Sequence, residues 1–451
     1  MRKRNKKRNL FLGINLEMDP SAAIIEDGKV LAYSEEERHV RVKHAQNYYP
    51  KESIKYCLSK ASCTISDVTA ITINWNLTGY NDGHMKLFYE KMKTKYNIDK
   101  NTIAWQKRNL KKRSWQEYKN FHKKELGKIF GKVKIPQIKD FPHHYTHAFQ
   151  TFKQSNFSEA ICITIDGSGD EHCTVVWECK DFYIKPIYEV FMPHSLGWFY
   201  AAITEYLGFE AYDGEYKVMG LAAYGKPNES IRKQLQQFVK ISSDGVGYEI
   251  DPKYIHYGMH TFSGRYTDDL VDLFRRLPRK ENEKITDWHK SLAYEVQSIL
   301  EDNVIRIITW AVNKTKIRNI CVGGGVGLNV KLNSRIFQHK DVRDVFAHPL
   351  CGDSGAACGS ALLGNYSVTK AVPEKLSTLA LGYEESKSEI KNILKISKVL
   401  FEEKKDIALS VAELLEKGFI VGWFQGRMEA GPRALGQRSI LANPTKKIYR
   451  D

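Results

Sequence analysis

The stretch EAICITIDGSGDEHCTVVWECKDFYIKPIYEV, residues 159–190, carries the pattern from which the fold is predicted. It predicts a strand over 160–165, a small-residue turn DGSGD at 166–170, a strand in CTVVWEC, a turn at 180–181 and a third strand. Residues 9–37, NLFLGINLEMDPSAAIIEDGKVLAYSEEE, repeat this order of strand, turn, strand, turn, strand. The second turn of this earlier copy is Asp27-Gly28, a hairpin signal between two apolar runs.

Each copy precedes a longer, mostly helical stretch, which indicates an internal duplication with a cleft between two halves. This is the plan of the α/β actin-like ATPase (ASKHA) fold, in which the hairpin turns face the nucleotide phosphates. Two unrelated meanders would give the same pattern, and the pattern alone leaves that alternative open.

Two glycine-rich turns predict a ligand at the end of the second copy. In the DGSGD turn, Gly167 and Gly169 allow backbone N–H groups to face an anion. In NICVGGGVGLNVKLNSRI, residues 319–336, an apolar strand runs into three glycines and then a helix, which suits the approach of a flat ligand or a phosphate. The segment is neither a Walker A loop nor a complete GxGxxG motif.

A metal site is predicted from FPHHYTHAFQ, residues 141–150. His143 and His147 are four residues apart and would share one face of a helix, while His144 is interpreted as a structural histidine. Asp166 ends an apolar strand, so its carboxylate needs a partner. Asp353 lies in a turn before the small-residue helix of GDSGAACGSALLG, at a strand-to-helix switch where ligands gather. Two histidines with two aspartates suit Fe, Mn or Zn better than Ca, although an HxxxH spacing also arises by accident.

Composition narrows the function classes. The 451 residues suffice for two or three domains. The net charge of +16 is unevenly distributed along the chain. Residues 84–134 hold 16 Lys/Arg against 4 Asp/Glu, and residues 1–8 hold six basic groups. We expect 84–134 to be a solvated helical insertion; the alternative is a collar that attracts an anionic substrate or a membrane surface. No motif supports nucleic-acid binding.

No apolar run reaches membrane-span length, LFLGI is too short for a signal peptide, and the eight cysteines form no CxxC pair, so a cytoplasmic protein with reduced thiols is expected.

Six motifs together resemble one enzyme family. They are EEERHVRVKH, HHYTHA, SLGWFYAAITEYLGFEAYDGEYKVMGLAAYG, GGGVGLNVKLNSRI, GDSGAACGSAL and GWFQGRMEAGPRALGQRSILANP. From about residue 10 to its end, the chain is similar to the O-carbamoyltransferases of the NodU/CmcH type. The resemblance implies an actin-like domain over 1–375, similar to the threonylcarbamoyl-tRNA transferase subunit, and the N-terminal part of a YrdC-like domain over 376–451.

The resemblance also implies an activity and its ligands. Carbamoyl phosphate and ATP, with magnesium accompanying the ATP, would give carbamoyl-adenylate, and the carbamoyl group would pass to a hydroxyl of a small molecule or sugar at the metal site. The acceptor and the oligomeric state are left open. The roles implied are metal binding by His143, His147, Asp166 and Asp353; nucleotide binding by Gly323, Gly324, Gly325 and Asn329; lining of the first site by Lys43, Glu215 and Lys217; and anion binding in the second by Arg427, Arg433 and Arg438.

The arginines have independent support, because three guanidiniums among glycines form a bidentate phosphate trap. Two departures qualify the resemblance. The family usually has His-Asp-Ala in its first turn, where this chain has Met18-Asp19-Pro20. Methionine is no base, so His44 or a carboxylate such as Asp19 is expected to replace the histidine.

The second departure is that the chain stops at Asp451, where family members continue. The YrdC-like domain is therefore expected to be incomplete and to make little carbamoyl-adenylate. Two alternatives keep the fold: an actin-like ATPase or small-molecule kinase, and a catalytically impaired homologue that acts as a binding module.

Overall fold

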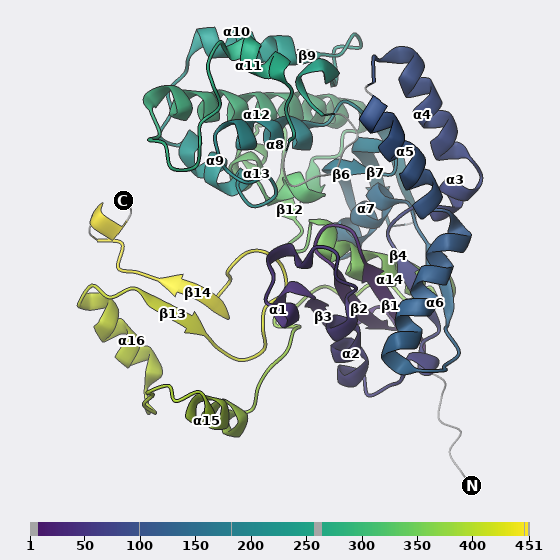
Figure 1. Ribbon diagram of the computed structural model, residues 1–451, viewed down its shortest axis with the longest axis vertical. Coiled ribbons are helices and arrows are strands. Elements are labelled where there is room, and N and C mark those ends of the chain that lie inside the picture. Colours follow the sequence, from purple (N-terminus) through teal and green to yellow (C-terminus); the bar gives the residue numbers. More distant parts are fainter. Residues whose placement is uncertain (1–7, 99, 182, 257–263, 446, 450–451) are drawn as a thin grey trace.

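The computed structural model describes residues 8–98, 100–181, 183–256, 264–445 and 447–449. Two similar α/β halves are followed by a C-terminal segment (Figure 1). The first half contains a five-stranded sheet in the order β3-β2-β1-β4-β5, in which β1 pairs antiparallel with β2 and parallel with β4. Its strands are β1 (Leu10–Asn15), β2 (Ser21–Glu26), β3 (Lys29–Glu35), β4 (Ala70–Ile73) and β5 (Gln137–Asp140).

The second half repeats this sheet. The order β12-β11-β6-β7-β8 again joins an antiparallel meander to two parallel strands. Its strands are β6 (Glu159–Gly169), β7 (His172–Lys180), β8 (Tyr183–Phe191), β11 (Asn319–Gly323) and β12 (Asp344–Ala347). The predicted duplication is confirmed, including the Asp27-Gly28 turn between β2 and β3. The predicted turn over 166–170 is wrong in its bounds, because β6 continues to Gly169 and the turn is formed by Asp170 and Glu171.

Two helices exchange places between the halves. α7 (His143–Lys153) follows the first sheet but packs on β6 and β11 of the second, and α14 (Asp353–Thr369) follows the second sheet but packs on β1, β2 and β4 of the first. Small residues allow this close approach: a Cβ on Gly13 would lie 1.8 Å from the Ala357 carbonyl oxygen. α7 and α14 also pack on each other, so their N-terminal ends lie close together.

The basic insertion forms three helices, as predicted: α4 (His84–Lys95), α5 (Lys100–Lys112) and α6 (Trp115–Phe130). They run down one side of the molecule beside both halves (Figure 1). The expectation of a solvated insertion is correct for the outer faces and wrong for the inner ones. Tyr89 and Met92 join the core of the second half, and Tyr118 and Leu126 join that of the first. The insertion therefore covers both cores with the apolar inner faces of its helices, and its lysines lie on the outer faces.

The second half carries most of the remaining helices. They are α8 (Leu196–Tyr206), α9 (Glu215–Ala222), α10 (Glu229–Phe238), α11 (Asp268–Phe274), the 29-residue α12 (Asp287–Thr315) and α13 (Val330–Phe337). Of these, α8 packs on β6, and α12 packs against α8, α9, α10 and α13. In the first half, α1 (Glu37–Val40) and α2 (Lys51–Lys60) follow β3, and α3 (Leu77–Asn81) follows β4.

The C-terminal segment lies to one side of the two halves (Figure 1). It consists of α15 (Lys387–Ile396), α16 (Ile407–Glu416) and an antiparallel pair, β13 (Val421–Phe424) and β14 (Arg438–Leu441). Buried Ala430 anchors it, since this residue belongs to the same apolar cluster as Phe11 and Leu350 of the two halves. All eight cysteines are unpaired thiols, as expected. Among the described residues, no helix combines the length and the hydropathy that a bilayer crossing needs.

Candidate metal centre and its surroundings

The structure brings the four predicted metal ligands together. One donor atom from each of His143, His147, Asp166 and Asp353 fits in a set whose members all lie within 4.8 Å of one another. His147 Nε2 is 3.3 Å from Asp166 Oδ2, and His143 Nε2 is 3.5 Å from Asp353 Oδ1. The exchange of helices explains this, because α7 presents both histidines on one face while α14 begins at Asp353.

This donor set fits a divalent cation. Asp166 Oδ2 and Asp353 Oδ1 are buried and accept no hydrogen bond from the described residues, and the two histidine Nε2 atoms face each other at 3.1 Å. Burial disfavours a charged His143, but Asp353 and Asp166 outweigh burial and raise the pKa of His143 to about 10. A cation would displace that proton and pair the buried carboxylates. Two nitrogen and two oxygen donors suit Fe(II), Mn(II) or Zn(II).

Residues that the sequence analysis did not assign hold His143 in place. Its Nδ1 lies 3.2 Å from the Asn74 carbonyl oxygen, and the Trp75 ring lies 4.9 Å from its ring. Asp170 accepts hydrogen bonds from the amides of His143 and Asn76, both at 2.9 Å, and so ties the start of α7 to the loop after β4. The DGSGD turn contains Asp170, which could have been found there. His144 is a core histidine, as predicted: its Nδ1 lies 2.9 Å from Thr164 Oγ1.

The glycines have a packing explanation. A Cβ on Gly169 would lie 2.1 Å from His143 Cδ2, and one on Gly324, where φ is +83°, would lie 2.3 Å from Ile165 O. Side chains at Gly167 and Gly323 would meet Trp198 and Thr151. Gly325 N–H donates to Asp166 Oδ1 at 2.8 Å, which fixes that carboxylate.

The predicted base lies in a separate cluster. His44 Nδ1 is 2.7 Å from Asp19 Oδ1, and His44 Nε2 is 3.7 Å from Asp213 Oδ1. Burial lowers the pKa of His44, but hydrogen bonding and charge from Asp19 outweigh it, and the net pKa is raised. Lys43 borders the same cluster: its half-exposed ammonium pairs with Glu37 at 3.1 Å, and Glu37 Oε2 also accepts from the His44 N–H at 2.8 Å.

The segment at 212–213 links the base cluster to the metal centre. Asp213 faces His44, and the phenol of its neighbour Tyr212 is close enough to Asp353 for that charge to raise the tyrosine pKa, after the larger effect of burial.

The predicted nucleotide residues are spread more widely. Asn329 caps α13 by accepting from Leu332 N–H and shares two hydrogen bonds with Gln297. Lys217 is exposed on α9, with Phe209 and Tyr216 as ring neighbours. Glu215 accepts from Tyr212 N–H at 3.0 Å, and burial raises its pKa.

The three C-terminal arginines contact different parts of the chain. Arg427 donates to Leu381 O and Tyr56 Oη, which secures the segment to α2. Arg433 donates to Leu328 O and Arg438 to Gly431 O. The anion trap stays a prediction, and in this structure backbone carbonyls occupy donors of all three.

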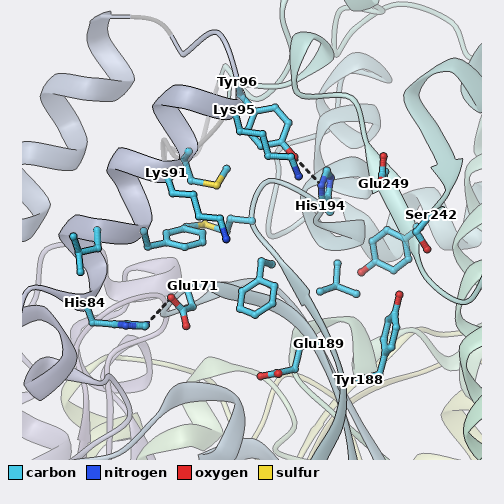
Figure 2. A pocket seen from close by; sticks show the side chains of 17 residues that line it. His84, Lys91, Lys95, Tyr96, Glu171, Tyr188, Glu189, His194, Ser242 and Glu249 are labelled. Atoms are coloured by element: carbon cyan, nitrogen blue, oxygen red, sulfur yellow. Dashed lines mark hydrogen bonds and ion pairs between the residues drawn. The ribbon is translucent and has the colours of Figure 1, made fainter. Parts of the chain in front are cut away.

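A second feature is a cleft under α4, about 500 Å³ in volume (Figure 2). Figure 2 shows Lys91 and Lys95 on the α4 side, with Glu189 on β8 and Glu249 on β10 (Tyr248–Ile250) across from them. Two contacts join the walls: His84 Nε2 to Glu171 Oε2 at 2.7 Å, and Tyr96 Oη to His194 Nε2 at 3.0 Å. None of the sequence motifs described above predicts this cleft.

Comparison with known proteins gives the following. The family profile described as carbamoyltransferase N-terminus matches residues 11–362, and the one described as carbamoyltransferase C-terminus matches 412–451. An uncharacterized protein of Synechocystis sp., sll1178, is 32% identical over 94% of this chain and 69% of its own length. Nodulation protein NolNO of Sinorhizobium fredii is 31% identical over 96% of this chain and 59% of its own length.

Among solved structures, component A of the (R)-2-hydroxyglutaryl-CoA dehydratase of Acidaminococcus fermentans covers 80% of this chain and 98% of its own, at 14% identity and a TM-score of 0.39. Against another relative, an uncharacterized protein MJ1058 of Methanocaldococcus jannaschii, the chain spans about half of the relative's length, 54%.

Proposed function

Since the chain belongs to the carbamoyltransferase family, as the motifs had indicated, we propose that it transfers a carbamoyl group to a hydroxyl of a small molecule or sugar at the centre formed by α7 and α14. The observation that carries the proposal is the convergence of four buried donor atoms, two of them carboxylate oxygens without a hydrogen bond among the described residues. Such oxygens favour a cation, and a cation bound there would supply Lewis-acid polarisation of a carbonyl oxygen.

The donor in this proposal is carbamoyl-adenylate, made from carbamoyl phosphate and ATP. The family profiles support carbamoyl transfer in general, and the motif resemblance alone implies this donor. We assign residues 1–375 to an actin-like transfer unit and 376–451 to a YrdC-like segment. The repeated order of the two sheets supports the first assignment. ATP binding by the 323–329 turn, by Lys217 and by the C-terminal arginines remains a prediction, as does a cytoplasmic location.

His44 is the base in the proposed transfer. Asp19 would hold the Nδ1 proton at 2.7 Å, which leaves Nε2 to accept the proton of the acceptor hydroxyl. The hydroxyl oxygen then forms a bond to the carbamoyl carbon, the bond from that carbon to the AMP phosphate oxygen breaks, and AMP leaves with the electron pair. Asp19 also stabilises the imidazolium that forms. The residue at the usual base position, Met18, has no part in the reaction.

The test supplies preformed carbamoyl-adenylate with a carbon-13 label to the protein, with a panel of sugars as acceptors. With the wild type we expect a product heavier by one carbamoyl group, together with release of AMP. Both should be lost in His44→Ala. His256→Ala, at an exposed histidine, is the matched control. ATP–pyrophosphate exchange, with and without carbamoyl phosphate, measures formation of the donor separately. Release of AMP at equal rates by the wild type and His44→Ala would contradict the assigned base.

A further inference from the structure

The basic insertion contributes one buried charge to the interior. Arg113, between α5 and α6, is 6% exposed, and its Nη2 lies 2.7 Å from Glu17 Oε2. Its Nε donates to Asn109 Oδ1 at 2.9 Å. Nη1 is buried without a hydrogen bond among the described residues. A buried guanidinium with an unsatisfied donor is a poor device for stability alone, because desolvation offsets much of the attraction to Glu17.

On one side, Arg113 reaches the metal centre through one intermediate. Its Cζ lies 4.1 Å from the centroid of the Trp75 ring, a cation–π contact, and the Trp75 ring in turn lies 4.9 Å from that of His143. The residue before the tryptophan, Asn74, accepts from His143 through its carbonyl oxygen. The guanidinium therefore supports the loop after β4, against which His143 rests.

On the other side, Arg113 reaches the base cluster. Its partner Glu17 lies in the turn between β1 and β2, two residues before Asp19. Asn15 Nδ2 closes that turn by donating to the carbonyls of Met18 and Asp19, at 2.7 and 3.2 Å. Asp19 has a left-handed backbone, with φ at 58°, so its carboxylate depends on the turn for its direction toward His44.

From these contacts we infer that Arg113 is a positioning residue that sets the place of His143 and of Asp19 together. The inference rests on the proposed function, because it gives both residues a role. One planar cation is in contact with Trp75 and Glu17 at once, so a displacement of the insertion moves a ligand of the centre and the partner of the base in concert. The insertion is then part of the machinery of transfer as well as a cover over the two cores. The sequence shows only one arginine in a run of basic residues, KKRSW at 111–115.

The test compares Arg113→Met, which removes the charge and the planar stack, with Arg113→Lys, which keeps the charge alone. Arg108→Met, at an exposed arginine on α5, is the matched control. The main readout is a titration with Co(II), followed by its visible absorption in the full-length protein. We expect Arg113→Met to weaken Co(II) binding about tenfold and to alter the spectrum, as loss of a residue behind a ligand does, with Arg113→Lys between it and the wild type.

The second readout is the NMR titration of the His44 ring in histidine-labelled protein, assigned with His44→Gln. Arg113→Met and Glu17→Gln should both change this titration, and the double variant should change it no further. Circular dichroism at the temperature of each measurement tests whether the variants are folded. Spectrum, affinity and His44 titration all unchanged in folded Arg113→Met would overturn the inference.

The failure of the proposed function has a different signature. If the wild type binds no Co(II), or if His143→Ala binds Co(II) as well as the wild type does, the assignment of the metal centre is wrong. The His44 titration then decides the role of Arg113 alone: a change in Arg113→Met but not in Arg108→Met supports positioning of Asp19, and no change refutes it.

Discussion

The centre between α7 and α14 and the cleft under α4 differ in how their polar groups are arranged. The centre is small: four donor atoms, two from α7 and one each from β6 and α14, lie within 4.8 Å of one another, and two of them are buried carboxylate oxygens that lack hydrogen bonds among the described residues. The cleft is large, about 500 Å³, and its lysines and glutamates stand on exposed, opposite walls. Convergence of buried donors that need a partner indicates a ligand more strongly than volume does.

The largest effect should come from breaking the centre itself. Asp353→Ala or His143→Ala removes one of four donors, and bound transition metal should fall from about one per chain to near zero, with the fold retained. Elemental analysis of the purified proteins measures this. Asp344→Ala, at an exposed carboxylate on β12, should keep its metal. Full metal occupancy in both ligand variants would show that these residues do not bind the metal. The centre would then be no stronger candidate for a ligand site than the cleft.

The base cluster should give the next largest effect. Asp19→Asn removes the charge that raises the His44 pKa, so the rising limb of the transfer rate against pH should move to lower pH, and the rate should fall about 100-fold. The pair stabilises the folded protein below the unfolded histidine pKa of about 6.5, and this contribution is lost as pH rises through the higher folded pKa. The variant should therefore lose more in melting temperature at pH 6 than at pH 9. A pH profile of the variant that matches that of the wild type would show that Asp19 does not set the pKa of the base.

Metal removal sharpens the comparison through stability. A cation that binds only the folded state at 100 times its Kd adds about 2.7 kcal/mol to the free energy of unfolding. A chelator should lower the melting temperature of the wild type by the corresponding amount and leave Asp353→Ala unchanged. Scanning calorimetry at fixed protein concentration measures both, and an equal decrease in the two proteins would indicate an effect away from the centre.

The smallest effect is expected at the cleft. Lys91→Ala with Lys95→Ala should change the free energy of unfolding by less than about 1 kcal/mol, because both ammonium groups are exposed. Lys86→Ala with Lys107→Ala, at exposed lysines outside the cleft lining, is the control. If the insertion steers an anionic substrate, the apparent second-order rate should also fall and lose part of its salt dependence. Equal salt dependence in both variants would leave the lysines as a solvated surface.

The sequence predicted what local patterns encode. The four-residue spacing of His143 and His147, the apolar strand that leads to Asp166 and the turn with Asp353 before a small-residue helix are each visible within about ten residues. The structure adds that these segments meet. Trp75 and Arg113 were missed because their roles depend on contacts across 38 and more positions of sequence, which leave no local signature. The inner face of the insertion was misread for a related reason, since frequent lysines on its outer face obscure the apolar residues between them.

The exchange of α7 and α14 also divides the centre by chemistry. Both nitrogen donors lie on the chain before residue 155 and both oxygen donors lie after it. A bound divalent ion would thus cross-link the stretches of chain before and after residue 155, with imidazole from one and carboxylate from the other. Fragments 8–155 and 156–451, produced separately, would each carry only one donor type. Recovery of metal binding when they are mixed would measure how well the halves realign, which makes the ion a reporter of domain alignment.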